Sequence, residues 1–290
     1  MEIPNGKSLF DQVRAALLGC YPATEAAAIA WRVVETHTGL GRMAILAGKN
    51  PAHFVAADFA AIIHRLQAHE PVQYVLGETE FAGFKLKVSP AVLIPRPETE
   101  ELVAWIAQEQ AATAGPVPPI FLDMGTGSGA IALALAKLLA PVRAIALDIS
   151  PAALALAQEN ALAQHTLIDF RQVDMLALVG AGSTLEWPIF DFIVSNPPYV
   201  MASEAGAMHP NVLDHEPHLA LFVPDDDPLR FYRAIGQFAR HHLKPGGPLY
   251  LEINEQLGAA TSQLLRSIGF QHLQIRPDVH GKDRMLRACI

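Results

Sequence analysis

Ile120-Phe121-Leu122-Asp123-Met124-Gly125-Thr126-Gly127-Ser128-Gly129 joins a short apolar run to three glycines separated by small polar residues. The run predicts a buried strand, and the almost entirely apolar stretch 130–139 that follows predicts a helix. Glycines between them allow positive φ angles and a close backbone approach, while the start of the helix offers free N–H groups. The segment therefore predicts the first strand, turn and helix of an α/β domain, with a ligand at the turn.

Two ligand classes fit this turn. Gly125-x-Gly127-x-x-Ala130 satisfies the dinucleotide fingerprint. Asp123-x-Gly125-x-Gly127-x-Gly129 is equally a pattern for S-adenosylmethionine, with an acid on the strand before the turn. The turn by itself leaves both alternatives open.

Further strands follow at regular spacing, and each ends in a polar residue. Apolar residues 142–147 end at Asp148, residues 170–173 end at Asp174, and residues 190–194 lead to Asn196. Helical stretches separate them, which is the α/β pattern and places these side chains at one edge of a parallel sheet. Asp148 suits the two hydroxyls of a ribose. The alternative for Asp148 is a cap for the helix that starts near Pro151.

Asn196-Pro197-Pro198-Tyr199 ends the last of these strands abruptly. Consecutive prolines donate no backbone hydrogen bond and cannot continue a sheet. The Asn196 side-chain oxygen and the Pro197 carbonyl can each accept one hydrogen of a planar NH2 group, against which the Tyr199 ring can lie. This chemistry favours an amino-group substrate at the ligand-binding edge of the sheet, and hence the methyl donor over the dinucleotide.

Composition limits the class of protein. The chain has 290 residues, 51% of them hydrophobic, and a formal net charge of −8. An acidic chain lacks the basic footprint of a duplex-binding surface, so we expect no direct nucleic-acid binding. Two cysteines make no disulfide framework, and the histidines match no zinc pattern, so we expect no metal site. No signal peptide or membrane span is evident, which predicts a cytoplasmic protein without a membrane partner.

The amino-terminal part has a different character. Residues 1–70 read as a small helical domain, in which Ser8 and Thr24 are candidate N-caps and 58–66 is a further helical run. Residues 71–95 read as a linker whose Gly83 lies in a β-hairpin, and 96–290 as the main domain. The helical domain is either a packing accessory or a substrate-recognition module.

The chain resembles the PrmC (HemK) family of release factor glutamine methyltransferases over essentially its whole length. The motifs that carry the resemblance are Glu70-Pro71-Val72-Gln73-Tyr74-Val75-Leu76-Gly77, Phe81, Leu93-Ile94-Pro95-Arg96-Pro97-Glu98-Thr99-Glu100, Asn196-Pro197-Pro198-Tyr199 and Glu216-Pro217-His218-Leu219-Ala220-Leu221. A sister family that acts on a ribosomal protein typically has Arg-Ser-Pro where this chain has Arg96-Pro97-Glu98-Thr99.

The resemblance implies a seven-stranded, Rossmann-like class I methyltransferase sheet with an antiparallel final strand, preceded by a helical domain and a hairpin. It implies transfer of a methyl group from S-adenosyl-L-methionine to the glutamine amide in the Gly-Gly-Gln motif of peptide chain release factors, which modulates translation termination. The catalytic residues it implies are Asn196, Pro197 and Tyr199. The substrate-binding residues are Asn196, Pro197, Pro198 and Tyr199. The cofactor-binding residues are Gly125, Thr126, Gly127, Ser128, Gly129, Asp148, Asp174, Met175 and Asn196.

Three positions depart from the family pattern. Met175 stands where an aromatic residue is common, so adenine stacking should be looser, although a thioether still packs on a flat ring. Asn254 stands where glycine is usual, and Lys282 where arginine is usual.

Two other functions compete with this one. An adenine-amine nucleic-acid methyltransferase would use the same Asn-Pro-Pro-Tyr motif, because a flipped base presents the same NH2 group. A non-catalytic dinucleotide-binding protein would use the first interpretation of the glycine turn. We expect a monomer, and a lid in the long segment between Tyr199 and Leu229.

Overall fold

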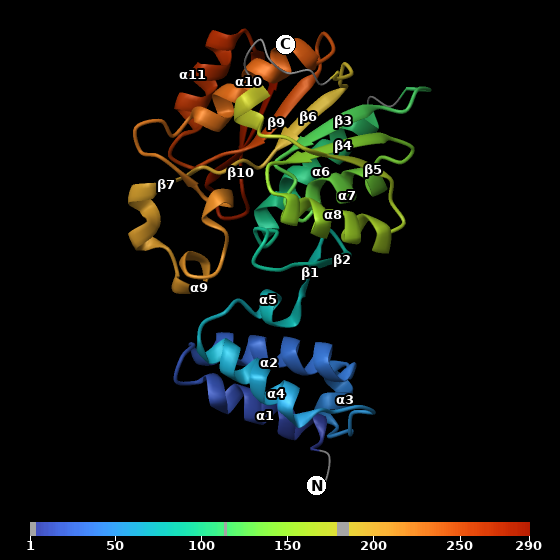
Figure 1. Ribbon diagram of the computed structural model, residues 1–290, viewed down its shortest axis with the longest axis vertical. Coiled ribbons are helices and arrows are strands. Elements are labelled where there is room, and N and C mark those ends of the chain that lie inside the picture. Colours follow the sequence, from blue (N-terminus) through green and yellow to red (C-terminus); the bar gives the residue numbers. More distant parts are fainter. Residues whose placement is uncertain (1–3, 113–114, 179–185) are drawn as a thin grey trace. The chain divides into compact units, whose positions relative to one another are not determined.

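The computed structural model describes residues 4–112, 115–178 and 186–290 (Figure 1). Residues 1–3, on which part of the signal-peptide expectation falls, lie outside the described residues. The chain forms two compact units. The first contains the residues up to Glu78 together with His209–His215, and the second contains Thr79–Met208 together with Glu216–Ile290.

The first unit is helical. Its helices are α1 (Gly6–Leu17), α2 (Ala23–Thr38), α3 (Arg42–Leu46), α4 (Ala56–Gln67) and α5 (Val72–Leu76), with α9 (Pro210–Leu213) in the second segment. Leu9, Val13 and Leu17 recur every four residues, so they share one face of α1 and are fully buried in the core of this unit. Arg65 ties α4 to α5, because it pairs with Glu70 and donates to the Val75 carbonyl at 3.1 Å.

Local details of this unit differ from the sequence-based expectations. Asn5, and not Ser8, caps α1, since its Oδ1 accepts from the Ser8 N–H at 2.9 Å. Thr24 lies inside α2, which begins after Pro22 without a side-chain cap. The segment expected as a linker contains α5, whose first turn uses the Pro71 carbonyl as acceptor. A five-residue helix has too little periodicity to stand out in a sequence.

The second unit contains a seven-stranded sheet, which confirms the predicted fold class (Figure 1). In spatial order its strands are β10 (Gln271–Pro277), β11 (Asp283–Cys289), β9 (Pro248–Glu252), β6 (Phe192–Ser195), β3 (Ile120–Met124), β4 (Arg143–Asp148) and β5 (Ile168–Gln172). Neighbours from β9 to β5 pair in parallel, whereas β11 is antiparallel to both β9 and β10. The final strand is therefore antiparallel, as predicted.

Helices cover both faces of this sheet (Figure 1). Side chains alternate along each strand, so Phe121 and Phe192 face one layer while Leu122 and Ile193 face the other. The first layer contains α6 (Pro97–Ala112), α7 (Ala130–Leu138) and α8 (Pro151–Ala163). The second contains α10 (Arg230–His242) and α11 (Gly258–Ile268). Burial on both faces explains why the central strands are continuous apolar runs.

Short elements complete this unit. The hairpin expected at Gly83 is present as β1 (Glu78–Phe81) and β2 (Phe84–Lys87), with positive φ at Ala82 and Gly83. The segment after Tyr199, which shows no clear pattern in the sequence, contributes β7 (Val200–Met201), η2 (Ala202–Ala207), η3 (His218–Ala220) and β8 (Phe222–Val223) to this unit, while α9 between them belongs to the first unit. Strands β7 and β8 pair with each other in parallel. The turn η1 (Met175–Leu178) follows β5.

Candidate functional site

A cavity lies at the carboxyl ends of four parallel strands. Residues that follow each strand line it: Gly125–Ser128 after β3, Asp148–Ser150 at the end of β4, Val173–Leu176 after β5, and Asn196 and Pro198 after β6. The remaining wall comes from the segment before α6, from α6, α7, α8 and α10, and from the loop after Tyr199. Its residues are Ala91, Val92, Leu93, Pro95, Arg96, Thr99, Ala130, Ile131, Ala153, Pro217, Leu219, Ala220 and Phe231. All of these residues belong to the second unit.

The glycine turn forms the floor of this cavity. The N–H groups of Gly125 and Thr126 donate to the Leu147 carbonyl at 2.9 Å, which closes the turn against β4. Gly125 has a φ of +80°, and a Cβ added there would come within 3.0 Å of the Met175 methyl carbon. Gly129 has a φ of +82° and does not line the cavity; an added Cβ would approach the Cβ of Ala157 to 3.2 Å. The first glycine leaves space beside Met175, and the last allows α7 to pack on α8.

Asn160 supports the turn from behind. This buried α8 residue donates from Nδ2 to the Ser128 carbonyl at 2.9 Å and to the Lys87 carbonyl at 3.0 Å. Its Oδ1 accepts from the Lys87 N–H at 2.7 Å. One amide therefore joins the hairpin, α8 and the glycine turn, which no local sequence pattern indicates.

Asp148 organises the turn and lines the cavity. Its Oδ2 accepts from the Gly127 N–H, and its Oδ1 from the Ser150 N–H, both at 2.9 Å. Burial raises the pKa of this carboxyl group. Ser150 is the residue that caps α8, because its Oγ accepts from the Ala153 N–H at 3.2 Å. A carboxylate offers about four lone-pair sites, so Asp148 can still accept from a ligand hydroxyl.

Asp123 lies deeper and does not line the cavity. It is fully buried, and its Oδ2 accepts from the Thr126 hydroxyl at 2.7 Å. Its Oδ1 has no hydrogen-bond partner among the described residues. Burial, together with the negative charge of Asp148, raises the pKa of Asp123 to about 7.

Asp174 and Met175 line the wall beside the glycine turn. Asp174 Oδ1 accepts from the Leu176 N–H at 2.8 Å, which starts the turn η1. The side chain of Met175 is 8% exposed and also packs in the core of the second unit. The methionine therefore offers the cavity a flexible apolar surface where the family commonly offers an aromatic ring.

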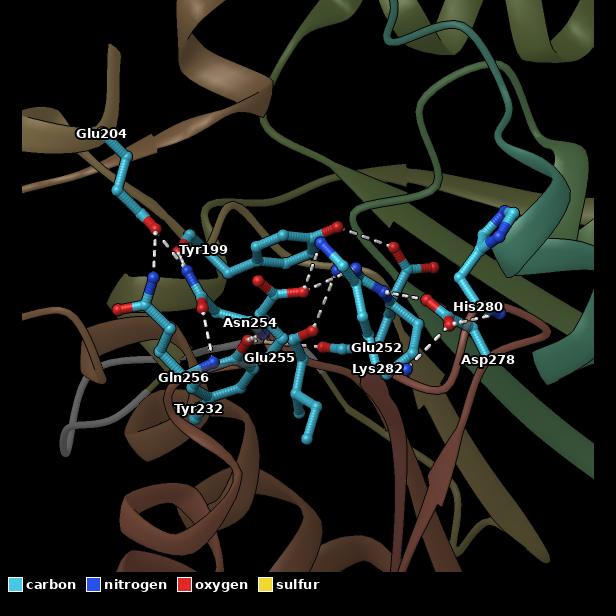
Figure 2. A network of polar contacts seen from close by, with 12 residues as sticks. Tyr199, Glu204, Tyr232, Glu252, Asn254, Glu255, Gln256, Asp278, His280 and Lys282 are labelled. Carbon is cyan, nitrogen blue, oxygen red and sulfur yellow. Dashed lines mark hydrogen bonds and ion pairs between the residues drawn. The ribbon is translucent and has the colours of Figure 1, made fainter. Parts of the chain in front are cut away.

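The four residues of the Asn-Pro-Pro-Tyr motif do not share one environment. Asn196 and Pro198 line the cavity, whereas Pro197, which is buried, and Tyr199, which is partly buried, are not among its lining residues. The Tyr199 hydroxyl donates to Glu252 Oε1 at 2.8 Å (Figure 2). Burial and the nearby Glu252 charge raise the pKa of Tyr199, so the phenol keeps its proton.

A polar network holds Tyr199 from both ends (Figure 2). Asn254 Nδ2 donates to the Tyr199 carbonyl at 3.2 Å and to Glu204 Oε2 at 3.1 Å. The Tyr232 hydroxyl accepts from the Asn254 N–H at 3.3 Å. Asn254, which stands where the family usually has glycine, therefore joins the end of β9 to the Asn-Pro-Pro-Tyr turn and to η2.

Two groups at the site were missed from the sequence. Thr99 lines the cavity, 4% exposed, and accepts from Asn196 Nδ2 at 3.2 Å. Glu252, 1% exposed, accepts from the Thr99 hydroxyl at 2.6 Å. The available signal for Glu252 was an acid at the end of an otherwise apolar strand.

Arg96 and Glu216 form a second connection at the cavity wall. Arg96 Nη2 lies 2.6 Å from Glu216 Oε1, and the Ile94 N–H donates to Glu216 Oε2 at 3.1 Å. Glu216 is 4% exposed and is followed by Pro217, Leu219 and Ala220 of the wall. The ion pair therefore fastens the segment after the motif to the segment before α6.

No helix in the described ranges is both long and apolar enough to cross a membrane. The profile of the family described as "Methyltransferase small domain" matches residues 115–215. Among solved structures, a methyltransferase from Pyrococcus furiosus is 18% identical with a TM-score of 0.50, covering 71% of this chain and 89% of that one. The hMettl16 catalytic domain, in complex with a 3′UTR hairpin, is 17% identical with a TM-score of 0.55, covering 77% and 80%. At these identities the two structures support the fold alone.

Curated relatives are closer. A release factor glutamine methyltransferase of Bacteroides thetaiotaomicron is 41% identical, covering 95% of this chain and 97% of the relative. The proteins of the same name from Flavobacterium psychrophilum and Streptococcus pneumoniae are each 43% identical. They cover 80% and 78% of this chain, and 79% and 77% of their own lengths. With its fold, its glycine turn and its Asn-Pro-Pro-Tyr motif at the strand edge, this chain belongs to the family of release factor glutamine methyltransferases.

Proposed function

We propose that this protein methylates the side-chain amide nitrogen of the glutamine in the Gly-Gly-Gln motif of release factors, with S-adenosyl-L-methionine as the donor, and so modulates translation termination. The observation that carries the proposal is that Asn196 lies in the same cavity as the glycine turn and Asp148. A group that can bind an NH2 therefore lies beside groups suited to a nucleoside. The names of the relatives supply the substrate class.

The residues around the cavity fit the proposed donor. Gly125 leaves space beside Met175, where an added Cβ would fill the gap. The free lone pairs of Asp148 suit ribose hydroxyls, and Asp174 and Met175 suit the edge and face of an adenine. The adjoining residues Thr126, Gly127, Ser128 and Gly129 complete the proposed binding turn. When bound, S-adenosyl-L-methionine supplies an electrophilic methyl group on a sulfonium.

The protein's own contribution is orientation. No side chain from Asn196 to Tyr199 is a strong base, and an amide nitrogen is a poor nucleophile. Asn196 Oδ1 and the Pro197 carbonyl would each accept one hydrogen of the substrate NH2, which fixes the plane of the amide. Pro198 lines the cavity with Asn196, and Tyr199, held by Glu252, keeps the turn in place. Holding the amide nitrogen in line with the methyl group of the donor would lower the barrier to methyl transfer, because positioning of the reactants is a major source of enzymatic rate enhancement.

We further propose that the protein works in the cytoplasm as a monomer, on a protein substrate and without direct contact with nucleic acid. The net charge of −8 supports the last point. We keep the proposed division into a helical recognition domain (1–70), a linker with a hairpin (71–95) and a methyltransferase domain (96–290). The separate helical core of the first unit supports recognition by that part.

The direct test is incubation with an isotopically labelled methyl donor and purified release factor, followed by mass spectrometry of the modified peptide. We expect one methyl group on the glutamine amide. Asn196→Ala should bind the donor within a few-fold of the wild-type affinity and lose about 10²–10³ in rate, as when a positioned hydrogen-bonding group is removed. Label in nucleic acid, or full activity of Asn196→Ala, would contradict the proposal.

A further inference from the structure

A chain of three hydrogen bonds runs from the cavity into the interior of the second unit. Asn196 Nδ2 donates to Thr99 Oγ1 at 3.2 Å, and the Thr99 hydroxyl donates to Glu252 Oε2 at 2.6 Å. The other oxygen of Glu252 accepts from the Tyr199 hydroxyl at 2.8 Å. The chain joins β6, α6 and β9, which are far apart in the sequence.

Glu252, at the buried end of this series, determines which group donates and which accepts in each hydrogen bond. Both carboxyl oxygens of Glu252 accept from hydroxyls, Oε1 from Tyr199 and Oε2 from Thr99. A hydroxyl has a single hydrogen, and Thr99 uses it on Glu252, which leaves only lone pairs for Asn196. Of the two ends of the Asn196 amide, only the NH2 can satisfy Thr99. The Oδ1 is then the end left for the cavity that Asn196 lines.

The buried setting makes this direction costly to reverse. Thr99 and Glu252 are 4% and 1% exposed, so water cannot readily replace a lost partner. Burial raises the pKa of Glu252, whereas the hydrogen bonds from the Thr99 and Tyr199 hydroxyls and the nearby positive charge of Arg284 oppose that rise. Rotation of the Asn196 amide by 180° would place two acceptors, Oδ1 and Thr99 Oγ1, against each other.

We propose that Glu252 is a positioning residue that acts through Thr99 and fixes which atom of the Asn196 amide faces the substrate. The inference rests on the proposed function, since it assigns Asn196 Oδ1 to the NH2 group of the substrate glutamine. It adds a source of selectivity. A site that presents acceptors binds the amide of glutamine and rejects the carboxylate of glutamate, which has no hydrogen to donate.

The test compares matched variants by donor affinity and by kcat on release factor. Thr99→Val keeps the β-branched shape and removes the hydroxyl, whereas Thr99→Ser keeps the hydroxyl. Glu252→Gln is nearly isosteric, but the NH2 of the glutamine can donate to Thr99 and so reverse the direction of the hydrogen bonds between Glu252 and Asn196. Thr261→Val is the control, because Thr261 is fully buried in α11 and its hydroxyl has no partner among the described residues.

We expect Thr99→Val and Glu252→Gln to lose about 10–100-fold in kcat, as when a residue that orients an active-site group is changed. Donor affinity should remain within a few-fold. Thr99→Ser should recover most of the rate lost in Thr99→Val, and Thr261→Val should match the wild type. If Thr99→Val and Glu252→Gln keep the wild-type kcat while Asn196→Ala is inactive, this inference fails and the proposed function stands.

A second measurement does not depend on turnover. In an NMR spectrum of the wild type, the side-chain NH2 signal of Asn196 is assigned by its loss in Asn196→Ala. We expect one of its hydrogens to exchange slowly with solvent, and to exchange faster in Thr99→Val but not in Thr99→Ser. Equal exchange in all three proteins would overturn the inference, whether or not release factor proves to be the substrate.

Discussion

Asn196 matters as a residue because its amide carries a donor and an acceptor on one rigid plane. The donor end is engaged by Thr99 at 3.2 Å, so the acceptor end is available to a ligand in the cavity. Asp148 has a comparable double use, since one oxygen holds the glycine turn and the other the start of α8, while the carboxyl group also lines the cavity. The effect of a substitution at either residue therefore depends on which of the side chain's hydrogen-bonding atoms it removes.

Asn196→Asp separates the two ends of the amide. Aspartate keeps an acceptor oxygen but loses the NH2 that donates to Thr99, and it places a second carboxylate close to Glu252. We expect methylation of release factor to fall by about 10² or more, close to the rate of Asn196→Ala, with donor affinity retained. Single-turnover rates of the two variants check this. If Asn196→Asp retains much more activity than Asn196→Ala, the acceptor oxygen at this position is sufficient for methylation and the hydrogen bond to Thr99 is not needed.

Asp148→Ala should weaken S-adenosyl-L-methionine binding by about 1.5–3 kcal/mol, the usual worth of hydrogen bonds to a charged group. Part of this loss would come from the glycine turn and the start of α8, because the N–H groups of Gly127 and Ser150 lose their acceptor. Asp148→Asn is the control, since it keeps one acceptor and the shape of the side chain. Calorimetry that finds unchanged affinity in a folded Asp148→Ala protein would show that the acid serves only the turn.

At the scale of elements, β3 and the turn after it combine a tight backbone with a buried acid. Burial raises the pKa of Asp123 to about 7 in the folded protein, against 3.8 for an ordinary aspartate. The folded state therefore binds more protons between these two values, so its stability should fall as the pH rises through that window. Above pH 7 the penalty is fully present.

Asp123→Asn should remove this pH dependence. Asparagine is neutral at every pH and keeps an oxygen to accept from Thr126. Urea denaturation at pH 5 and pH 8 should therefore show the wild type losing more stability between the two values than the variant does. If both proteins lose the same amount, other groups carry the pH dependence and the carboxylate of Asp123 is better solvated than its burial indicates.

Helix α11 offers a test of a buried hydroxyl outside the site. Thr261 is fully buried, and its Oγ1 has no hydrogen-bond partner in the parts of the chain that the structure describes. Thr261→Val replaces the hydroxyl with a methyl group of similar size at little change in helix propensity. We expect the free energy of unfolding to rise by about 1 kcal/mol, because the penalty of an unsatisfied buried group is removed. A destabilised variant would reveal a water or partner at this hydroxyl.

At the scale of the whole molecule, every residue that lines the cavity belongs to the second unit, whereas the first unit has a separate helical core. The segment His209–His215, between the Asn-Pro-Pro-Tyr motif and Glu216, is part of the first unit. The loop that we expected to form a lid is therefore shared between the two units along the chain.

Deletion of residues 1–70 should leave donor affinity within a few-fold and remove most activity on whole release factor. A short peptide containing the target glutamine should lose less activity, because it needs only the cavity. The ratio of kcat/KM on the two substrates, measured for the full-length and shortened proteins, tests the recognition role. An unchanged ratio in a folded protein would assign that segment to packing alone.

The sequence alone determined the α/β class, the glycine turn and the strand that stops at Asn-Pro-Pro-Tyr. These features depend on short-range rules: apolar runs of strand or helix length, glycines where φ is positive, and prolines that cannot pair. Helix caps were harder to predict from the sequence, because Asn5 and Ser8 are both good capping residues. Which of them caps α1 depends on where the helix begins.

Only the tertiary structure decided which distant side chains meet at the site. Thr99 lies 97 residues before Asn196 and 153 before Glu252 in the chain, yet the three form one hydrogen-bonded series. Arg96 and Glu216, 120 residues apart, meet in the same way. Such contacts leave no period in the sequence, since a polar side chain bonded across the fold looks like any other polar residue. They arise only when packed strands and helices bring the groups together away from water, where each must find a partner.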